Sequence, residues 1–186
     1  DTLIYCSEDE ELKKLALEHT KCKLLPYETP NHIIQNGVTL IEDTKLLIFG
    51  KHNLQNLNAA RLVCNELGIS NTDFYQKIAN FKGASNRLEL VKSKAKSAIY
   101  KDFAHSPSKL KATTSAMKSQ FPNRKLVACM ELHTFSSLNK KFLKQYRGTM
   151  NEPDTAIIYF NPDSISHKKI KSITKKQIYS AFNRHD

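Results

Sequence analysis

An aspartate and a histidine lie three positions apart in a polar turn, inside the stretch 98–110. The residues before the turn are apolar and favour a strand, and Ser106 followed by Pro107 favours the start of a helix. In α/β folds, ligands gather where a strand ends and a helix begins. Asp102 is therefore a candidate acceptor for the hydroxyl groups of a sugar, with His105 beside it. The alternative is that Asp102 only caps the helix or forms the turn.

A second polar group is expected at the start of a helix between Gly50 and Gly68. Apolar residues recur there at helical spacing, and Gly68 is suited to end the helix. Asn53 is the expected N-cap, and His52 and Asn56 lie within one turn of it. Amide side chains at a helix N-terminus can hold a base or a phosphate. Plain capping is the alternative.

Arg87 follows residues 81–86, a stretch rich in Gly, Ser and Asn that shows no periodicity. We interpret this stretch as a domain linker. Domain movement can carry an arginine just past a linker towards a ligand, and the planar guanidinium suits phosphate. The alternative is a surface ion pair between Arg87 and a nearby carboxylate, such as that of Glu89.

The elements that must position these residues differ on the two sides of the linker. Strands are expected at 2–6, 22–27, 32–35, 38–41, 44–49, 87–91, 98–100, 125–130 and 155–160. Asn36-Gly37 predicts a tight hairpin before the linker, where the strands suggest the antiparallel rim of a larger sheet. After the linker, buried strands alternate with helices, which predicts a right-handed parallel sheet.

The net charge of +11, from 29 basic and 18 acidic residues, requires an explanation. Five lysines gather near the C-terminus: Lys168, Lys169, Lys171, Lys175 and Lys176. No nucleic-acid motif accompanies them, and no aromatic residues interleave with them, so we expect no nucleic-acid partner. A phosphorylated small molecule would account for part of the charge, and so would a solvated lysine face.

Membrane insertion and secretion are not indicated by the sequence. No run approaches the roughly 20 apolar residues that span a bilayer, and no signal peptide is visible. The four cysteines are far apart and form no CxxC pair, which argues against a zinc site. We therefore expect a protein of the reducing cytoplasm. The abrupt start of the chain suggests a fragment.

Three motifs stand in order along the chain: Gly50–Ala60 (GKHNLQNLNAA), Phe81–Glu89 (FKGASNRLE) and Lys101–Pro107 (KDFAHSP). Together they resemble the Mur ligases, ATP-dependent enzymes that form amide bonds in peptidoglycan synthesis. The resemblance implies an α/β fold. Residues 1–82 would be the tail of the central ATPase domain, and residues 83–186 a Rossmann-like C-terminal domain, a mostly parallel sheet with flanking helices, that lacks its end.

The resemblance also implies roles for the polar residues. Asn53 and Asn56 would lie at the adenine side of ATP, Arg87 would reach its phosphates as the catalytic residue, and Asp102 would hold the ribose hydroxyls. His105 and His133 would face the amino substrate, although His133 can equally be a turn residue.

Within the family, the stretch 131–138 (ELHTFSSL) resembles the branch that joins UDP-N-acetylmuramate to the tripeptide L-alanyl-γ-D-glutamyl-meso-diaminopimelate. The alternative is the branch that uses L-alanine as the acceptor. The oligomeric state is left open.

Several family features have no counterpart in the chain. Gly50-Lys51 is not the phosphate-binding loop, since no glycine lies five residues before Gly50 and no Ser or Thr follows Lys51. The UDP-binding domain, the main Mg²⁺ ligands and the carbamylated lysine are also absent. We therefore expect ATP and Mg²⁺ to serve a longer enzyme, and this chain not to turn over by itself. The remaining alternatives are a nucleotide-binding module without chemistry, a nucleic-acid-binding protein and a folate polyglutamate ligase.

Overall fold

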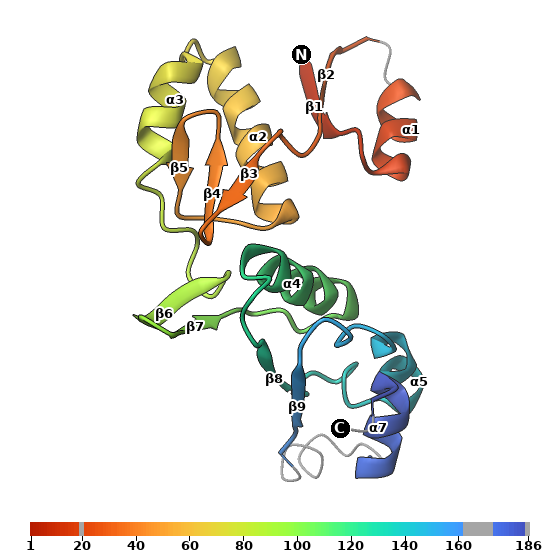
Figure 1. Cartoon of the computed structure of the whole chain (residues 1–186). Coiled ribbons are helices and arrows are strands. Elements are labelled where there is room, and N and C mark those ends of the chain that lie inside the picture. Colours follow the sequence, from red (N-terminus) through yellow and green to blue (C-terminus); the bar gives the residue numbers. More distant parts are fainter. Residues whose placement is uncertain (19–20, 162–172, 185–186) are drawn as a thin grey trace. The chain divides into compact units, whose positions relative to one another are not determined.

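The computed structural model describes residues 1–18, 21–161 and 173–184 (Figure 1). These residues form two compact units, Asp1–Ala84 (unit 1) and Ser85–Asp186 (unit 2). Of the five C-terminal lysines, Lys168, Lys169 and Lys171 lie outside the described residues. No helix in the described ranges is long and apolar enough to cross a membrane.

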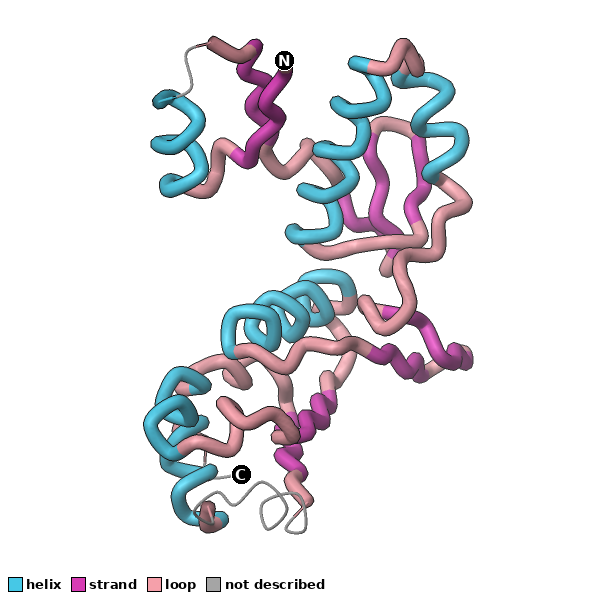
Figure 2. The backbone as a smooth tube through the Cα atoms, turned by 180° about the vertical axis from the view of Figure 1, so that it is seen from behind, coloured by secondary structure: helices cyan, strands magenta, loops and turns pink. Residues whose placement is uncertain are grey.

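Unit 1 combines two small sheets with three helices. Its elements are β1 (Thr2–Cys6), α1 (Glu10–Glu18), β2 (Lys23–Tyr27), β3 (Ile33–Gln35), β4 (Val38–Ile41), β5 (Thr44–Leu46), α2 (Lys51–Glu66) and α3 (Asn71–Ile78). Strands β1 and β2 pair in parallel, whereas β3, β4 and β5 form an antiparallel meander beside α2 and α3 (Figures 1 and 2). The predicted antiparallel strands are therefore present. Unit 1 also contains a separate sheet of two parallel strands, β1 and β2.

The hairpin predicted at Asn36-Gly37 is confirmed. Gln35 pairs with Val38, so the loop has two residues. Both loop residues have positive φ, 53° for Asn36 and 75° for Gly37. This conformation matches the right-handed twist of the strands, and Asn and Gly adopt it at the lowest cost.

Helix α2 ends as predicted but does not begin as predicted. Gly68 has a φ of +84°, and its N–H donates to the carbonyl of Asn65, a turn that closes the helix. Asn53 is not the N-cap, because the helix begins at Lys51 with Gly50 in the capping position. Gly50 has a φ of 87°, which a glycine tolerates. The helix can therefore begin at Lys51, two residues before Asn53, without a side-chain cap.

Unit 2 contains the following elements: β6 (Glu89–Lys94), β7 (Ser97–Lys101), α4 (Pro107–Gln120), β8 (Val127–Glu131), α5 (Lys140–Leu143), the 3₁₀ turn η1 (Lys144–Tyr146), β9 (Thr155–Tyr159) and α7 (Lys175–Phe182). Strands β8 and β9 pair in parallel, as predicted. Strand β7 instead pairs antiparallel with β6. A two-residue turn separates β6 from β7, and so short a loop makes the local hairpin the nearest pairing available.

Unit 2 is built on one apolar core. Its buried side chains are Leu110, Met130, Leu132, Leu138, Leu143, Tyr146, Met150, Ile173, Ile178, Ala181 and Phe182. Strands β8 and β9 bury only the face that meets this core: Met130 is 5% exposed and Val127 is 60% exposed. The expectation of fully buried strands is therefore wrong for this pair.

Candidate functional site

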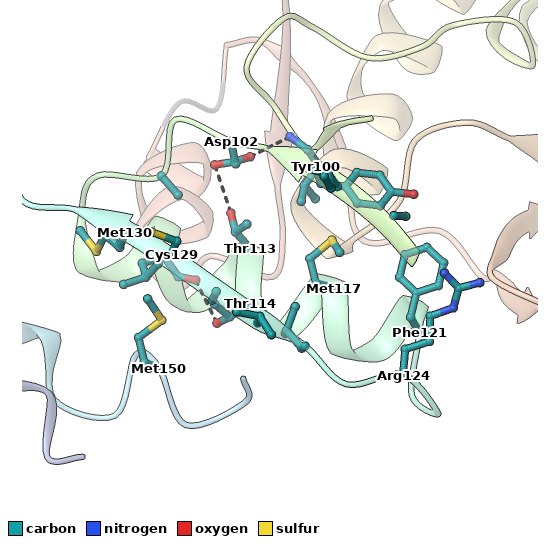
Figure 3. A pocket seen from close by; sticks show the side chains of 18 of the residues that line it. Tyr100, Asp102, Thr113, Thr114, Met117, Phe121, Arg124, Cys129, Met130 and Met150 are labelled. Atoms are coloured by element: carbon teal, nitrogen blue, oxygen red, sulfur yellow. Dashed lines mark hydrogen bonds between the residues drawn. The ribbon is translucent and has the colours of Figure 1, made fainter. Parts of the chain in front are cut away.

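A pocket of about 1010 Å³ lies in unit 2, lined by residues of β7, α4 and β8 (Figure 3). Three methionines, Met117, Met130 and Met150, contribute to its apolar lining. Asp102 and His105, the aspartate and the histidine of the polar turn, line the same pocket. Clefts lined by apolar side chains with a few polar groups are the usual form of a small-molecule site.

A second group of lining side chains is aromatic and basic. The ring centroids of Tyr100 and Phe121 are 5.9 Å apart, and the guanidinium carbon of Arg124 lies 5.4 Å from the Phe121 centroid. Figure 3 shows these three side chains together, apart from Asp102. A cation over an aromatic face is a favourable arrangement. The guanidinium of Arg124 brings a positive charge to this part of the pocket.

Asp102 is held by contacts from both sides of the turn. Its Oδ2 accepts a hydrogen bond from the backbone N–H of Leu88 at 2.8 Å, and its Oδ1 accepts one from Thr113 Oγ1 at 3.3 Å (Figure 3). The carboxylate therefore has a structural function, since Leu88 is only 6% exposed. Each oxygen has a further lone pair, so these bonds leave capacity for ligand hydroxyl groups.

The segment before Asp102 has an unusual backbone. Asn86 and Leu88 have φ values of 56° and 45°. Two hydrogen bonds fix Asn86. Its carbonyl accepts from the N–H of Phe103 at 2.8 Å, and its own N–H donates to the carboxylate of Glu89 at 2.8 Å. This backbone hydrogen bond lowers the pKa of Glu89. Left-handed conformations at residues other than glycine often mark functional segments.

Arg87 lies between the two strained residues, at the start of unit 2. Glu89 accepts from the N–H of Asn86 and from the hydroxyl of Ser85, and no ion pair joins it to Arg87 in the part of the chain that the structure describes. The surface ion pair considered from the sequence is therefore not formed.

Three rings meet at the ends of β7 and β8. The ring centroids of Phe103 and His105 are 5.0 Å apart, those of Phe103 and His133 are 6.0 Å apart, and those of the two histidines are 6.3 Å apart. We call Phe103, His105 and His133 the ring cluster. The structure thus brings together two histidines that are 28 positions apart in the sequence.

Asn53 and Asn56 belong to unit 1, whereas Arg87, Asp102 and the ring cluster belong to unit 2. Asn53 lies in the first turn of α2, where its Nδ2 donates to the carbonyl of Phe49 at 2.9 Å. Asn56 lies three residues on and is exposed. The two asparagines share one side of the helix, because residues three apart are neighbours on a helix surface.

The described residues show no candidate metal site. The described ranges contain no group of three or more His, Cys, Asp or Glu side chains that could hold a metal ion.

Some residues of the site were not singled out from the sequence. Phe103 is 59% exposed although it is aromatic, and its position between Asp102 and His105 was a signal that could have identified it. Thr113 lies on the face of α4 that meets Asp102, which helical spacing alone does not reveal. Tyr146 contacts His105 from 41 positions away, and no local pattern predicts such a contact.

Comparison with curated proteins finds relatives over almost the whole chain, although no family model matches. A UDP-N-acetylmuramate–L-alanine ligase from Caldicellulosiruptor bescii is 30% identical over 179 residues, which are 96% of this chain and 38% of that protein. A ligase of the same name from Lactococcus lactis is 31% identical over 125 residues, which are 66% of this chain and 28% of that protein. The chain therefore spans well under half the length of these relatives.

Solved structures show the same fold. The UDP-N-acetylmuramate–alanine ligase from Thermotoga maritima matches with a TM-score of 0.69 at 16% identity, covering 98% of this chain and 41% of that one. The MurF ligase from Thermotoga maritima, crystallised with ADP, matches with a TM-score of 0.63 at 17% identity, covering 97% and 53%. A folylpolyglutamate synthetase from Lactobacillus casei gives a TM-score of 0.55 over 87% of this chain. The predicted Mur ligase-like α/β fold is confirmed.

Proposed function

Since this chain is a relative of the Mur ligases in both sequence and fold, we propose that it is part of an ATP-dependent ligase that forms an amide bond in peptidoglycan synthesis. The observation that carries this proposal is the similarity to UDP-N-acetylmuramate–L-alanine ligases over 96% of the chain. The complete enzyme would activate the carboxylate of UDP-N-acetylmuramate with ATP, and an amine would then attack the activated carbonyl.

We propose L-alanine as the acceptor. The stretch 131–138 favoured the tripeptide, but the relatives named above carry the L-alanine name, so the tripeptide interpretation is not supported. Residues 131–138 lead from β8 into a turn after His133, and the turn is closed by paired bonds between Thr134 and Ser137.

We propose nucleotide-binding roles for residues of each unit, taken by itself. In unit 1, part of a central ATPase domain, the carboxamides of Asn53 and Asn56 would face the adenine. In unit 2, the C-terminal domain, Arg87 would reach the phosphates and the remaining lone pairs of Asp102 would receive the ribose hydroxyls. Bound ATP would supply the phosphoryl group, and Mg²⁺ would neutralise phosphate charge with ligands from outside this chain. We propose that the complete enzyme would bind ATP and UDP-N-acetylmuramate in the cytoplasm.

The ring cluster would face the acceptor amino acid. His105 and His133 line the same pocket as Asp102, so an acceptor held there would lie near the activated carboxylate. Positioning the amine in this way would lower the barrier mainly by removing the entropic cost of bringing two molecules together.

The test is ligation by the complete protein that contains this chain. ATP, Mg²⁺ and UDP-N-acetylmuramate would be supplied with either L-alanine or the tripeptide, and product and ADP would be quantified. We expect product and ADP with L-alanine and neither with the tripeptide. Product with the tripeptide alone would favour the recycling branch instead, and product with neither acceptor would contradict the proposed function.

A further inference from the structure

The turn that carries Phe103 and His105 is bound from a distant part of unit 2, and we propose that Tyr146 is a positioning residue for the ring cluster. Its hydroxyl group donates a hydrogen bond to the backbone carbonyl of His105 at 2.5 Å. The role in catalysis rests on the proposed function, but the contact and its effect on the rings do not.

Tyr146 is itself held rigidly. Its side chain is fully buried, at 0% exposure. The ring stacks on Phe182 with centroids 5.1 Å apart and planes 23° apart, and it meets the edge of Phe142 at 6.0 Å. Burial raises the pKa of Tyr146 to about 12, so the hydroxyl stays protonated and remains a donor across the physiological range.

The backbone of Tyr146 is fixed as well. Its carbonyl accepts hydrogen bonds from the N–H of Thr149 at 3.0 Å and from Thr149 Oγ1 at 2.7 Å. The carbonyl of Thr149 in turn accepts from Thr114 Oγ1 of α4 at 3.2 Å. Through Thr149, Tyr146 is therefore connected to helix α4, which begins two residues after His105. Tyr146 thus contacts the turn directly and is also tied to the helix that follows the turn.

The turn has an anchor on each side of the rings. On one side, the N–H of Phe103 donates to the carbonyl of Asn86, and on the other the carbonyl of His105 accepts from Tyr146. Between them, the N–H of His105 donates to the carbonyl of Phe103 at 2.9 Å. Removing the tyrosine hydroxyl would release the second anchor. The Nδ1 of His105 would still lie 3.1 Å from the carbonyl of Phe103, but the backbone of the turn could shift and carry the His105 ring away from its present position against the rings of Phe103 and His133.

The experiment is Tyr146→Phe in the 186-residue chain, read by NMR of the aromatic side chains. This substitution keeps the ring stack and deletes only the donor. We expect the cross-peaks between the rings of His105 and Phe103 to be lost and the ring-current shift of His105 to change, while the amide spectrum of the core is preserved. Unchanged ring contacts in Tyr146→Phe would overturn the proposal.

Two further variants separate positioning from plain stability. Leu138→Ala and Ile178→Val each truncate a buried side chain of the same core, but both keep the Tyr146 hydroxyl that binds His105. We expect each to lower the unfolding midpoint and to keep the ring contacts. If either variant lost the ring contacts as Tyr146→Phe does, the rings would depend on core packing and the proposal would fail. If Tyr146→Phe does not fold, loss of the ring contacts in either core variant would still overturn the proposal.

In the complete ligase, Tyr146→Phe should raise the KM for L-alanine about tenfold and leave the KM for ATP unchanged. The matched control is Tyr179→Phe, the same chemical change at a tyrosine that is 50% exposed. Equal KM values in wild type and Tyr146→Phe would overturn the catalytic part of the inference. A wild-type protein without ligase activity would contradict the proposed function instead, and the NMR result would stand.

Discussion

At the scale of single residues, Asp102 has one role that its contacts show and one that we propose. One is structural, because its carboxylate accepts from the backbone of Leu88 and from Thr113. The other is the proposed binding of ribose hydroxyls. A side chain of this kind cannot be assigned to ligand binding from loss of activity alone, since its removal would also disturb the turn.

We predict that Asp102→Ala lowers the free energy of unfolding by about 1–3 kcal/mol, because it leaves the nearly buried N–H of Leu88 without an acceptor. Asp102→Asn keeps an acceptor oxygen and should be closer to wild type. Denaturant unfolding of the 186-residue chain measures this difference. Thr113→Val is the matched control, since it removes only the longer bond. Equal stability of Asp102→Ala and wild type would show that the turn does not depend on this carboxylate.

At the scale of elements, one carboxylate connects three parts of unit 1. Glu8 precedes α1, and its Oε1 accepts from the N–H of Thr29, just after β2, at 2.5 Å. It also forms an ion pair with Lys51 at the start of α2. The hydrogen bond from Lys51, followed by those from Thr29, lowers the pKa of Glu8 from 4.5 to about 2.

The lowered pKa predicts a pH dependence with a definite sign. Because the folded-state pKa lies below the unfolded one, Glu8 stabilises unit 1 fully above pH 4.5, and this contribution is lost as the pH falls towards about 2. We expect Glu8→Gln to be less stable than wild type at neutral pH and equal to it near pH 2. Denaturant midpoints across this range test the prediction, with Glu18→Gln on α1 as control. A constant difference between the two proteins at every pH would argue against it.

At the scale of the whole molecule, each unit has its own apolar core. The core of unit 1 consists of Ile41, Leu46, Ile48, Leu54, Leu57 and Phe74. Among the described residues, the core cluster of unit 2 begins at Leu110. Segments with separate cores generally fold as separate domains.

We therefore predict that residues 85–186 fold without residues 1–84. The amide NMR spectrum of this fragment should match a subset of the peaks of the full chain. A fragment that begins at Pro107 is the control, because it keeps the core but lacks β6, β7 and the turn of Asp102. It should retain the core peaks. A collapsed spectrum for residues 85–186 would show that the core of unit 2 needs unit 1.

The sequence by itself determined most of the local structure. The two-residue loop at Asn36-Gly37, the end of α2 at Gly68 and the start of α4 at Pro107 follow from backbone preferences that act within a few residues. Asp102 and His105 lie close together because only three positions separate them in the sequence. The motifs that indicated the Mur ligases are short stretches of the same kind, and for this reason the order of the residues is enough to recognise them.

Tertiary structure decided the pairing of strands and the contacts between distant residues. Strand β7 was expected to join the parallel sheet but pairs with β6, because strand pairing depends on which partner is near and not on the strand's own residues. The meeting of His105 with His133, and the bond from Tyr146 to His105, join positions 28 and 41 apart. Such contacts arise when the core forms, and the core depends on the packing of many side chains at once.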